Sequence, residues 1–259
     1  MARSALTPEG KSHYDLMNIL DLDCGNTRLK WRLMREGELR QSGAVDNTGC
    51  CTSMLRQIAD VLCDQPARCR MSSVRAQEIN EVIETTVFDI WDIKVERPVK
   101  REYLGGVRLI GVDPAMYGED RWLGLLAARA VIPARPLVVV DSGTALTLDV
   151  IDAEGGFKGG LIVPGISLML KSMADNADRL LIPEQRHFRR GLGLKTVEAM
   201  QFGVASMAAA LIEKEYEFLG EGAAVVMGGG DATVLAELVT IPVLHLPDLV
   251  FEGLAIALP

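Results

Sequence analysis

Apolar residues recur along the chain with two spacings, every second residue in some segments and every three to four in others, which predicts strands interspersed with helices. Residues 18–23 alternate and residues 137–141 form a β-branched run, so both segments are predicted as strands. Further strands are expected at residues 29–35, 69–74, 91–95, 147–151, 223–227 and 243–244. Helices are expected at residues 53–62, 76–86, 119–131 and 196–219, after Gly165 and Asp231, and from about residue 248. This mixture is typical of an α/β protein.

Two of these strands lead into similar sequences. Asp23-Cys24-Gly25-Asn26-Thr27 ends the first strand, Asp141-Ser142-Gly143-Thr144 ends the run at 137–141, and another strand and a turn follow each motif. The copies begin 118 residues apart (141 − 23). An internal repeat of this size predicts two similar halves with a cleft between them.

Prolines mark the expected boundary between the halves. Pro133 and Pro136 end the helix predicted at 119–131, so we expect an N-terminal domain at residues 17–134 and a C-terminal domain at 135–259. Residues 1–16 are polar and lack the apolar region of a signal peptide, and we expect them to be a disordered extension.

Composition excludes several classes of protein. The chain has 259 residues, of which 27 are Lys or Arg and 35 are Asp or Glu, so its net charge is −8. It contains no stripe of basic residues, and we therefore expect no nucleic-acid partner. No apolar run approaches the roughly 18 residues of a membrane span, so no membrane association is expected. The five cysteines form no zinc-binding pattern, and free thiols indicate a cytoplasmic protein.

The repeated motif has residue types that suit a metal-bound polyphosphate. Aspartate at a strand end offers oxygen ligands to Mg²⁺, glycine lets the backbone approach a ligand, and threonine or asparagine adds a hydrogen-bond donor. A single such motif is more often an ordinary Asx turn. Two copies at matching points of a repeat favour phosphate binding.

The motifs as a set resemble those of type III pantothenate kinases, a family that includes Bvg accessory factors. They are Asp23 to Thr27, Gly118 to Arg121, Asp141 to Ala145, Gly159 to Gly165 and Gly228 to Ala232, in the family's order. The resemblance implies two ribonuclease-H-like domains of the actin/hexokinase/Hsp70 ATPase-like fold, with a nucleotide cleft between them. It also implies a homodimer that phosphorylates the 4′-hydroxyl of pantothenate in coenzyme A biosynthesis, with ATP, Mg²⁺ and a monovalent cation, K⁺ or NH₄⁺.

The resemblance also implies roles for individual residues. Asp23 and Asp141 are the expected metal ligands, although Asp21 lies on the same side of its strand as Asp23 and competes for that role. The residues expected to bind the nucleotide are Asp23, Gly25, Asn26, Thr27, Gly143, Thr144, Gly160 and Gly229.

The substrate residues lie at the starts of two predicted helices. Asp120 aligns with the family's catalytic base, although an aspartate in a first helical turn also simply stabilises the helix. Gly118, Arg121 and Thr196 are expected to bind pantothenate, Arg121 through its carboxylate and Thr196 across the dimer interface. Thr196 is also predicted to cap its helix, and the Walker-like sequence 191–196 is rejected because no strand precedes it.

One position departs from the family pattern. Relatives often carry a pocket tyrosine ten residues before the arginine, where this chain has Gly111. This departure concerns the wall of the substrate pocket and not the phosphate-binding motifs.

Two alternatives stay open beside the pantothenate kinase. The fold alone does not fix the substrate, so a kinase of the same fold for another small hydroxy acid is one. The accessory-factor name suggests the other, a non-catalytic regulatory protein.

Overall fold

The computed structural model describes residues 17–47, 49–176 and 186–259. Contacts divide the chain into two compact units, each described here by itself. The first contains the residues up to Val99, residues 118–120 and residues 257–259; the second contains residues 100–117 and 121–256. The expected extension at residues 1–16 lies outside the described residues.

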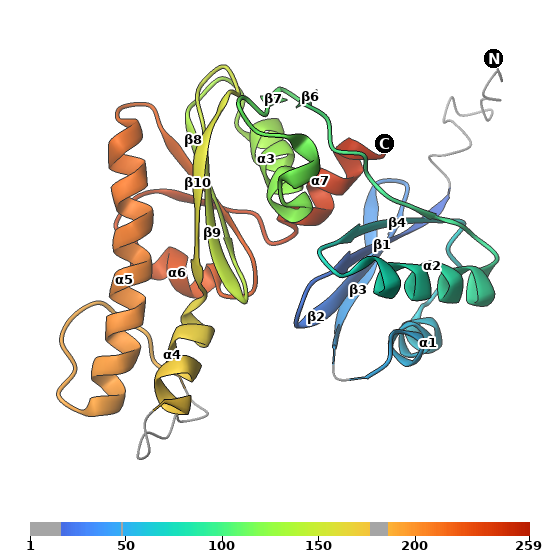
Figure 1. Cartoon of the computed structure of the whole chain (residues 1–259), viewed down its shortest axis with the longest axis horizontal. Coiled ribbons are helices and arrows are strands. Elements are labelled where there is room, and N and C mark those ends of the chain that lie inside the picture. The colour runs from blue at the N-terminus through green and yellow to red at the C-terminus, as the bar shows by residue number, and fades with distance from the viewer. Residues whose placement is uncertain (1–16, 48, 177–185) are drawn as a thin grey trace. The chain divides into compact units, whose positions relative to one another are not determined.

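The first unit is built on a five-stranded sheet in the order β3-β2-β1-β4-β5 (Figure 1). Its strands are β1 (Asn18–Cys24), β2 (Arg28–Arg35), β3 (Glu38–Asp46), β4 (Arg68–Ser73) and β5 (Val95–Glu96). β1 runs antiparallel to β2 and parallel to β4. Two helices, α1 (Cys51–Val61) and α2 (Gln77–Trp91), pack with this sheet around one apolar core.

The two sides of β1 carry different chemistry. Leu20 and Leu22 are fully buried in the core that α1 and α2 share with the sheet. Because side chains alternate along a strand, Asp21 and Asp23 point to the other side. Asp21 is nevertheless fully buried, which requires ionic partners.

Two arginines supply those partners. Arg32 Nε donates to Asp21 Oδ2 at 2.9 Å, and Arg70 donates from Nε to Oδ1 at 2.7 Å and from Nη2 to Oδ2 at 3.0 Å. Arg70 Nη1 also donates to the backbone oxygen of Leu258 at 2.8 Å. The carboxylate therefore links β1, β2 and β4 and, through Arg70, the segment that follows the last helix. Its partners give Asp21 a structural role in place of the metal-binding role for which it competed with Asp23.

The second unit repeats the topology of the first. Its sheet has the order β10-β9-β8-β11-β12, with β8 antiparallel to β9 and parallel to β11. The strands are β8 (Leu137–Ser142), β9 (Ala145–Ile151), β10 (Phe157–Pro164), β11 (Ala224–Gly228) and β12 (Val243–His245). The matching strand orders confirm the internal repeat seen in the sequence.

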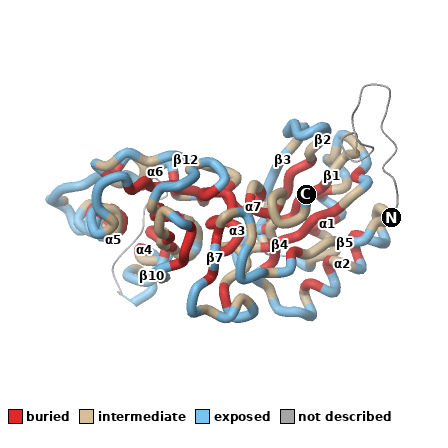
Figure 2. The backbone as a smooth tube through the Cα atoms, turned by 90° about the horizontal axis from the view of Figure 1, so that it is seen from above, coloured by how far each residue is buried: buried red, intermediate tan, exposed pale blue. Residues whose placement is uncertain are grey.

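Helices cover both faces of this second sheet (Figure 1). On one face α4 (Ile166–Asp175), α5 (Thr196–Leu219) and α6 (Ala232–Leu238) share an apolar core with β8, β9 and β11. On the other lie α3 (Glu119–Val131) and α7 (Leu249–Ala257), which pack so closely that a Cβ on Gly253 would lie 2.1 Å from the backbone oxygen of Leu123. Every residue of β11 is buried. In the first sheet, Figure 2 shows the buried residues of β1 and β4 in red.

The bounds of the elements test the sequence analysis. The helices at 119–131 and 196–219 are confirmed to the residue. The strand predicted at 91–95 is wrong at its start, because α2 continues to Trp91 and β5 spans only Val95–Glu96. Val87 is buried and Ile90 and Trp91 pack on the same core, so the helical spacing of apolar residues continues past residue 86. The hairpin β6 (Tyr103–Leu104) and β7 (Val107–Arg108) and the short 3₁₀ helix at Pro114–Met116 were not expected.

The boundary between the two contact units does not lie at Pro133 and Pro136, where the sequence predicted a domain boundary. Residues 100–117 and 121–134 cluster with the second sheet. The domain boundary at 134 and 135 stays a prediction, as does the cleft between the halves. Among the described residues, no helix combines the length and the apolar character needed to cross a membrane.

Replacing Asp21 should strongly destabilise the fold. Asp21→Asn leaves two buried guanidinium groups without their counter-charge, and breaking a buried ion pair costs about 3–5 kcal/mol. Urea denaturation should show a loss of that size. Asp175→Asn is the matched control, since Asp175 pairs with Lys171 on the surface and such pairs contribute about 0.5 kcal/mol or less. Equal losses in the two variants would contradict the structural role of Asp21.

Candidate functional site

The first repeated turn is a tight loop with exposed polar residues at its tip. Gly25 N–H donates to the backbone oxygen of Arg28 at 3.1 Å, which closes the turn between β1 and β2. Asn47 Nδ2 donates to the backbone oxygens of Gly25 and Asn26 at 2.8 and 3.1 Å. Asn26 and Thr27 are exposed. Asn47, which sequence reasoning missed, therefore fixes the turn while its tip stays accessible to a ligand.

Asp23 lies at the base of this turn in a mostly buried position. The exposed fraction of its side chain is 13%, and Lys30, directly opposite on β2, lies 3.6 Å from its Oδ2. Burial raises the pKa of Asp23 above its ordinary value, and the negative charge of Asp120 raises it further, while Lys30 opposes both effects. Two carboxylates thus lie close enough to repel each other, an arrangement that a bound cation would relieve.

Asp120 reaches this position because the start of α3 is anchored on β4. Its neighbour Glu119 accepts a hydrogen bond from the Ser73 N–H at 2.8 Å and lies 3.6 Å from Arg97. Gly118, Glu119 and Asp120 all belong to the first contact unit. The structure therefore brings the predicted base to the predicted metal ligand, and Glu119 is the anchor that the sequence did not reveal.

The second repeated turn is assembled in the second unit from segments far apart in sequence. Gly143 N–H donates to the backbone oxygen of Ala145 at 2.9 Å, and Gly165 N–H donates to that of Thr144 at 2.9 Å. Gly229 has φ +94°, and a Cβ there would lie 2.4 Å from Asp141 Oδ1. Of the residues expected to bind the nucleotide, Gly143, Thr144 and Gly229 therefore gather around Asp141.

Ser142 adds an unexpected polar group to this turn. Its hydroxyl is fully buried and has no hydrogen-bond partner among the described residues. Because side chains alternate along β8, Ser142 points to the face of the sheet opposite Asp141. The sequence motif contains Ser142, but no role was predicted for it.

Arg121 and Gly160 form a separate cluster with a residue that was not predicted. Arg121 donates to both oxygens of Asp149, at 2.9 Å from Nε and 2.5 Å from Nη2, and Tyr117 donates its hydroxyl to the same carboxylate at 2.6 Å. The guanidinium also lies over the Tyr117 ring at 4.6 Å from its centroid. A Cβ on Gly160 would lie 2.5 Å from Arg121 Nη2, so Gly160 lies against Arg121 rather than beside Asp141.

Thr196 and Gly111 lie in exposed backbone. Thr196 is the first residue of α5, and the N-cap is Lys195, so the predicted capping role of Thr196 is wrong. The Glu198 carboxylate accepts hydrogen bonds from the backbone N–H groups of Leu194 and Lys195, which lie just before the helix. Gly111 has φ +73°, and nothing lies within 4 Å of the position of a Cβ there.

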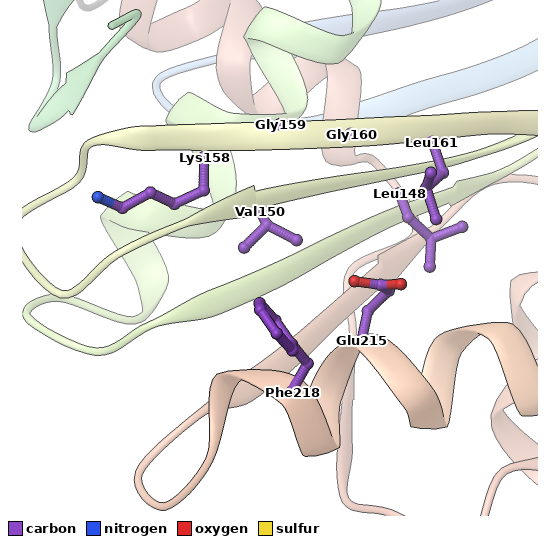
Figure 3. A pocket seen from close by; sticks show the side chains of 8 residues that line it. All are labelled: Leu148, Val150, Lys158, Gly159, Gly160, Leu161, Glu215 and Phe218. Atoms are coloured by element: carbon purple, nitrogen blue, oxygen red, sulfur yellow. The ribbon is translucent and has the colours of Figure 1, made fainter.

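An apolar cavity of about 190 Å³ lies between α5 and the strands β9 and β10 (Figure 3). Phe218 and Glu215 of α5 point toward Val150 and Leu148 of β9 across it. Gly160 is the only predicted site residue in its lining. The cavity therefore differs in place and in chemistry from both aspartate turns.

Comparison with known proteins agrees with the motifs. A family model described as type III pantothenate kinase matches residues 19–217. Proteins of that name from Cellvibrio japonicus and Pseudomonas syringae are each 32% identical to this chain, over 249 and 252 residues. The matches cover 92% and 93% of this chain and 96% and 99% of the relatives.

Solved structures show the fold. A Campylobacter jejuni protein described as a member of the Baf family of transcriptional activators matches with a TM-score of 0.58 and 20% identity, over 92% of this chain and 96% of that one. MreB 5 of Spiroplasma citri bound to AMPPNP matches with a TM-score of 0.52 and 9% identity, over 93% and 95%. The two units are ribonuclease-H-like domains of the actin/hexokinase/Hsp70 ATPase-like fold.

Gly229 should be far less tolerant of a side chain than another glycine with similar backbone. Gly222 also has a positive φ, +85°, but nothing lies within 4 Å of the position of its Cβ. Gly222→Ala should therefore show only the backbone strain of about 1–2 kcal/mol. Gly229→Ala should lose about 1–3 kcal/mol more in denaturant unfolding, because its Cβ meets Asp141. Similar losses would contradict the close approach.

Removing the charge of Asp23 should stabilise the protein at neutral pH. Its pKa is raised in the folded state, so the protonated form favours folding and this contribution is lost as the pH rises through the folded-state pKa. Asp23→Asn should raise the melting temperature at pH 7, and the difference should shrink as the pH falls toward about 4. Asp60→Asn, at an exposed position of α1, is the control. A lower melting temperature for Asp23→Asn at pH 7 would refute this interpretation.

Proposed function

Because the chain belongs to the type III pantothenate kinase family, it is a pantothenate kinase, and we propose that it transfers the γ-phosphoryl group of ATP to the 4′-hydroxyl of pantothenate. The observation that carries this conclusion is a family match over residues 19–217 together with relatives that align over nine-tenths of the chain. The ATPase-like fold accords with ATP as the phosphate donor. Asp23 and Asp141, at the two repeated turns, are residue types suited to bind the cations of a phosphoryl transfer.

Asp120 is the residue that we propose as the general base. It lies in the first turn of α3, where the helix dipole favours an ionised carboxylate. The Glu119–Ser73 hydrogen bond fixes this end of the helix and so limits the movement of Asp120. An oriented carboxylate can accept the hydroxyl proton as the oxygen attacks phosphorus.

The carboxylates of Asp23 and Asp141 are suited to cations that take their remaining ligands from phosphate oxygens and water. No group of three or more His, Cys, Asp or Glu side chains within the described ranges forms a protein-only metal site. Mg²⁺ commonly binds one or two carboxylates and takes its other ligands from water and phosphate. We propose that Asp23 holds Mg²⁺ through water and that Asp141 is the second cation ligand, with K⁺ or NH₄⁺ as the monovalent cation. These ions would neutralise phosphate charge.

The turns themselves supply donors to the phosphates in this proposal. Gly25, Asn26 and Thr27 of the first turn and Gly143, Thr144 and Gly229 around the second are the nucleotide-binding residues. The exposed tip of the first turn and the close packing of Gly229 on Asp141 support it. For Gly160, the position against Arg121 supports a place near pantothenate instead.

Pantothenate binding depends on Arg121 in this proposal. A guanidinium has five N–H donors, so binding to Asp149 leaves it chemically able to bind a second carboxylate. Gly118 and Thr196 are the other proposed substrate residues. A carboxylate-binding arginine directly after the base favours a substrate that carries both a carboxylate and a hydroxyl, as pantothenate does.

Exposed apolar side chains support a homodimer. Leu192 and Leu194, just before α5, are 90% and 97% exposed, and Met207 and Phe218 of α5 are 62% and 84% exposed. Apolar surface of this kind is typical of an interface between subunits. We propose that a second copy covers it and that the exposed Thr196 then contacts the partner's pantothenate. A cytoplasmic location also stays a prediction.

Asp120→Asn should abolish turnover without abolishing nucleotide binding. Purified protein with ATP, Mg²⁺, K⁺ and pantothenate should release ADP only when pantothenate is present. Loss of a general base lowers kcat by about 10²–10⁴-fold. The affinity for ATP, measured by calorimetry, should change little, and Asp89→Asn, at an exposed position of α2, should match the wild type.

Two outcomes would overturn the proposed function, and a third would overturn only the role of Asp120. A folded wild-type sample that formed no ADP above the pantothenate-free control would exclude the kinase, and a substrate other than pantothenate would favour the related hydroxy-acid kinase. Full activity of Asp120→Asn would exclude Asp120 as the base.

A further inference from the structure

Arg75 is held beside the Asp23 turn by the pairing of β4 with β1. The two strands run parallel with Ser73 opposite Cys24, and the Val74 N–H donates to the backbone oxygen of Cys24 at 3.3 Å. Arg75 follows at once, and its Nη1 lies 3.5 Å from the backbone oxygen of Gly25. The guanidinium therefore lies against the turn to which the proposed function assigns phosphate binding.

A buried polar pair fixes the backbone on both sides of Arg75. The Ser73 hydroxyl donates to Asn80 Oδ1 at 2.6 Å and accepts from the Arg75 N–H at 3.1 Å. Asn80 Nδ2 donates to the backbone oxygen of Arg75 at 3.2 Å. Ser73 and Asn80 are only 7% and 2% exposed. Buried polar groups are costly unless they are satisfied, and here they are satisfied by holding Arg75 in place.

Among the described residues, no carboxylate pairs with the Arg75 side chain, and its one side-chain contact of hydrogen-bonding length is that with Gly25. Arg70 and Arg121, in contrast, are each paired with a buried aspartate. A half-buried guanidinium on a fixed stretch of backbone, with no counter-charge among the described residues, is suited to bind an anionic ligand.

The negative charges around the turn favour a further positively charged side chain beside it. Asp23 and Asp120 repel each other there, and Lys30 lies 3.6 Å from the Asp23 carboxylate. A triphosphate would add further negative charge to the same place. We propose that Arg75 is a further phosphate-binding residue, which contacts the ATP phosphates at the Asp23 turn and neutralises charge there during transfer. This inference rests on the proposed function, because it takes the turn to be the phosphate site.

Replacement of Arg75 should weaken the binding of phosphates but not of the nucleoside. Charge-assisted hydrogen bonds are strong enough that Arg75→Ala should lower the affinity for ADP by at least about tenfold, measured by calorimetry. The affinity for adenosine should stay within about twofold. The kcat/KM for ATP should fall by a similar factor while the KM for pantothenate stays unchanged, and Arg75→Lys should restore part of the loss because it keeps the charge.

Arg56→Ala is the matched control, since Arg56 is an exposed arginine on α1 of the same unit. It should bind ADP as the wild type does. Equal losses of ADP and adenosine affinity in Arg75→Ala would indicate a structural role and overturn the proposal, and so would unchanged affinity for ADP. If the wild type lacked pantothenate-dependent ADP formation, the proposed function would fail, but the comparison of ADP with adenosine would still decide the role of Arg75.

Discussion

Parallel pairing in register places the functional groups of each unit at one edge of its sheet. β1 and β4 pair so that Asp23 lies opposite Ser72, and β8 and β11 pair so that Asp141 lies opposite Gly228. Because parallel strands end at the same edge, the segment after the second strand lies beside the turn after the first. Arg75 follows β4 and Gly229 follows β11 for this reason. A shift of either register by one residue would move both partners out of reach and reverse the face of every side chain.

The two units use this common plan for different chemistry. In the first unit the turn is lined by charged groups. Asp23 and Asp120 repel each other, and Lys30 of β2 lies opposite Asp23. In the second, close backbone contacts dominate: Gly165 and Gly229 each leave no room for a Cβ. The repeated fold therefore supplies two similar turns with different surroundings. Charged side chains surround the first turn, and closely packed backbone surrounds the second.

The sequence predicts best the features that depend on neighbouring residues. The helices at 119–131 and 196–219, the internal repeat and the two aspartate turns follow from local patterns. The end of α2 was misjudged because Trp91 suits a strand as well as a helix, and only its packing on the first core decides between them. For the candidate site, the motifs identified the turns and the start of α3.

Three residues to which the sequence assigned no role act through contacts between distant segments. Asn47 binds the turn from beyond β3, Glu119 binds the end of β4, and Asp149 binds Arg121 from β9. None of them stands in a pattern that local spacing can reveal, because each contact exists only after the strands have paired. Asp21 shows the same limit: its side of the strand was predicted, but its two arginine partners were not.

The contacts of Arg70 have a consequence for folding during synthesis. Arg70 binds Asp21 of β1 and also the backbone oxygen of Leu258, while Arg68 binds that of Pro259. These two arginines of β4 are translated long before residues 258 and 259. Their contacts with that segment therefore form later during synthesis than the pairing of β1 with β4.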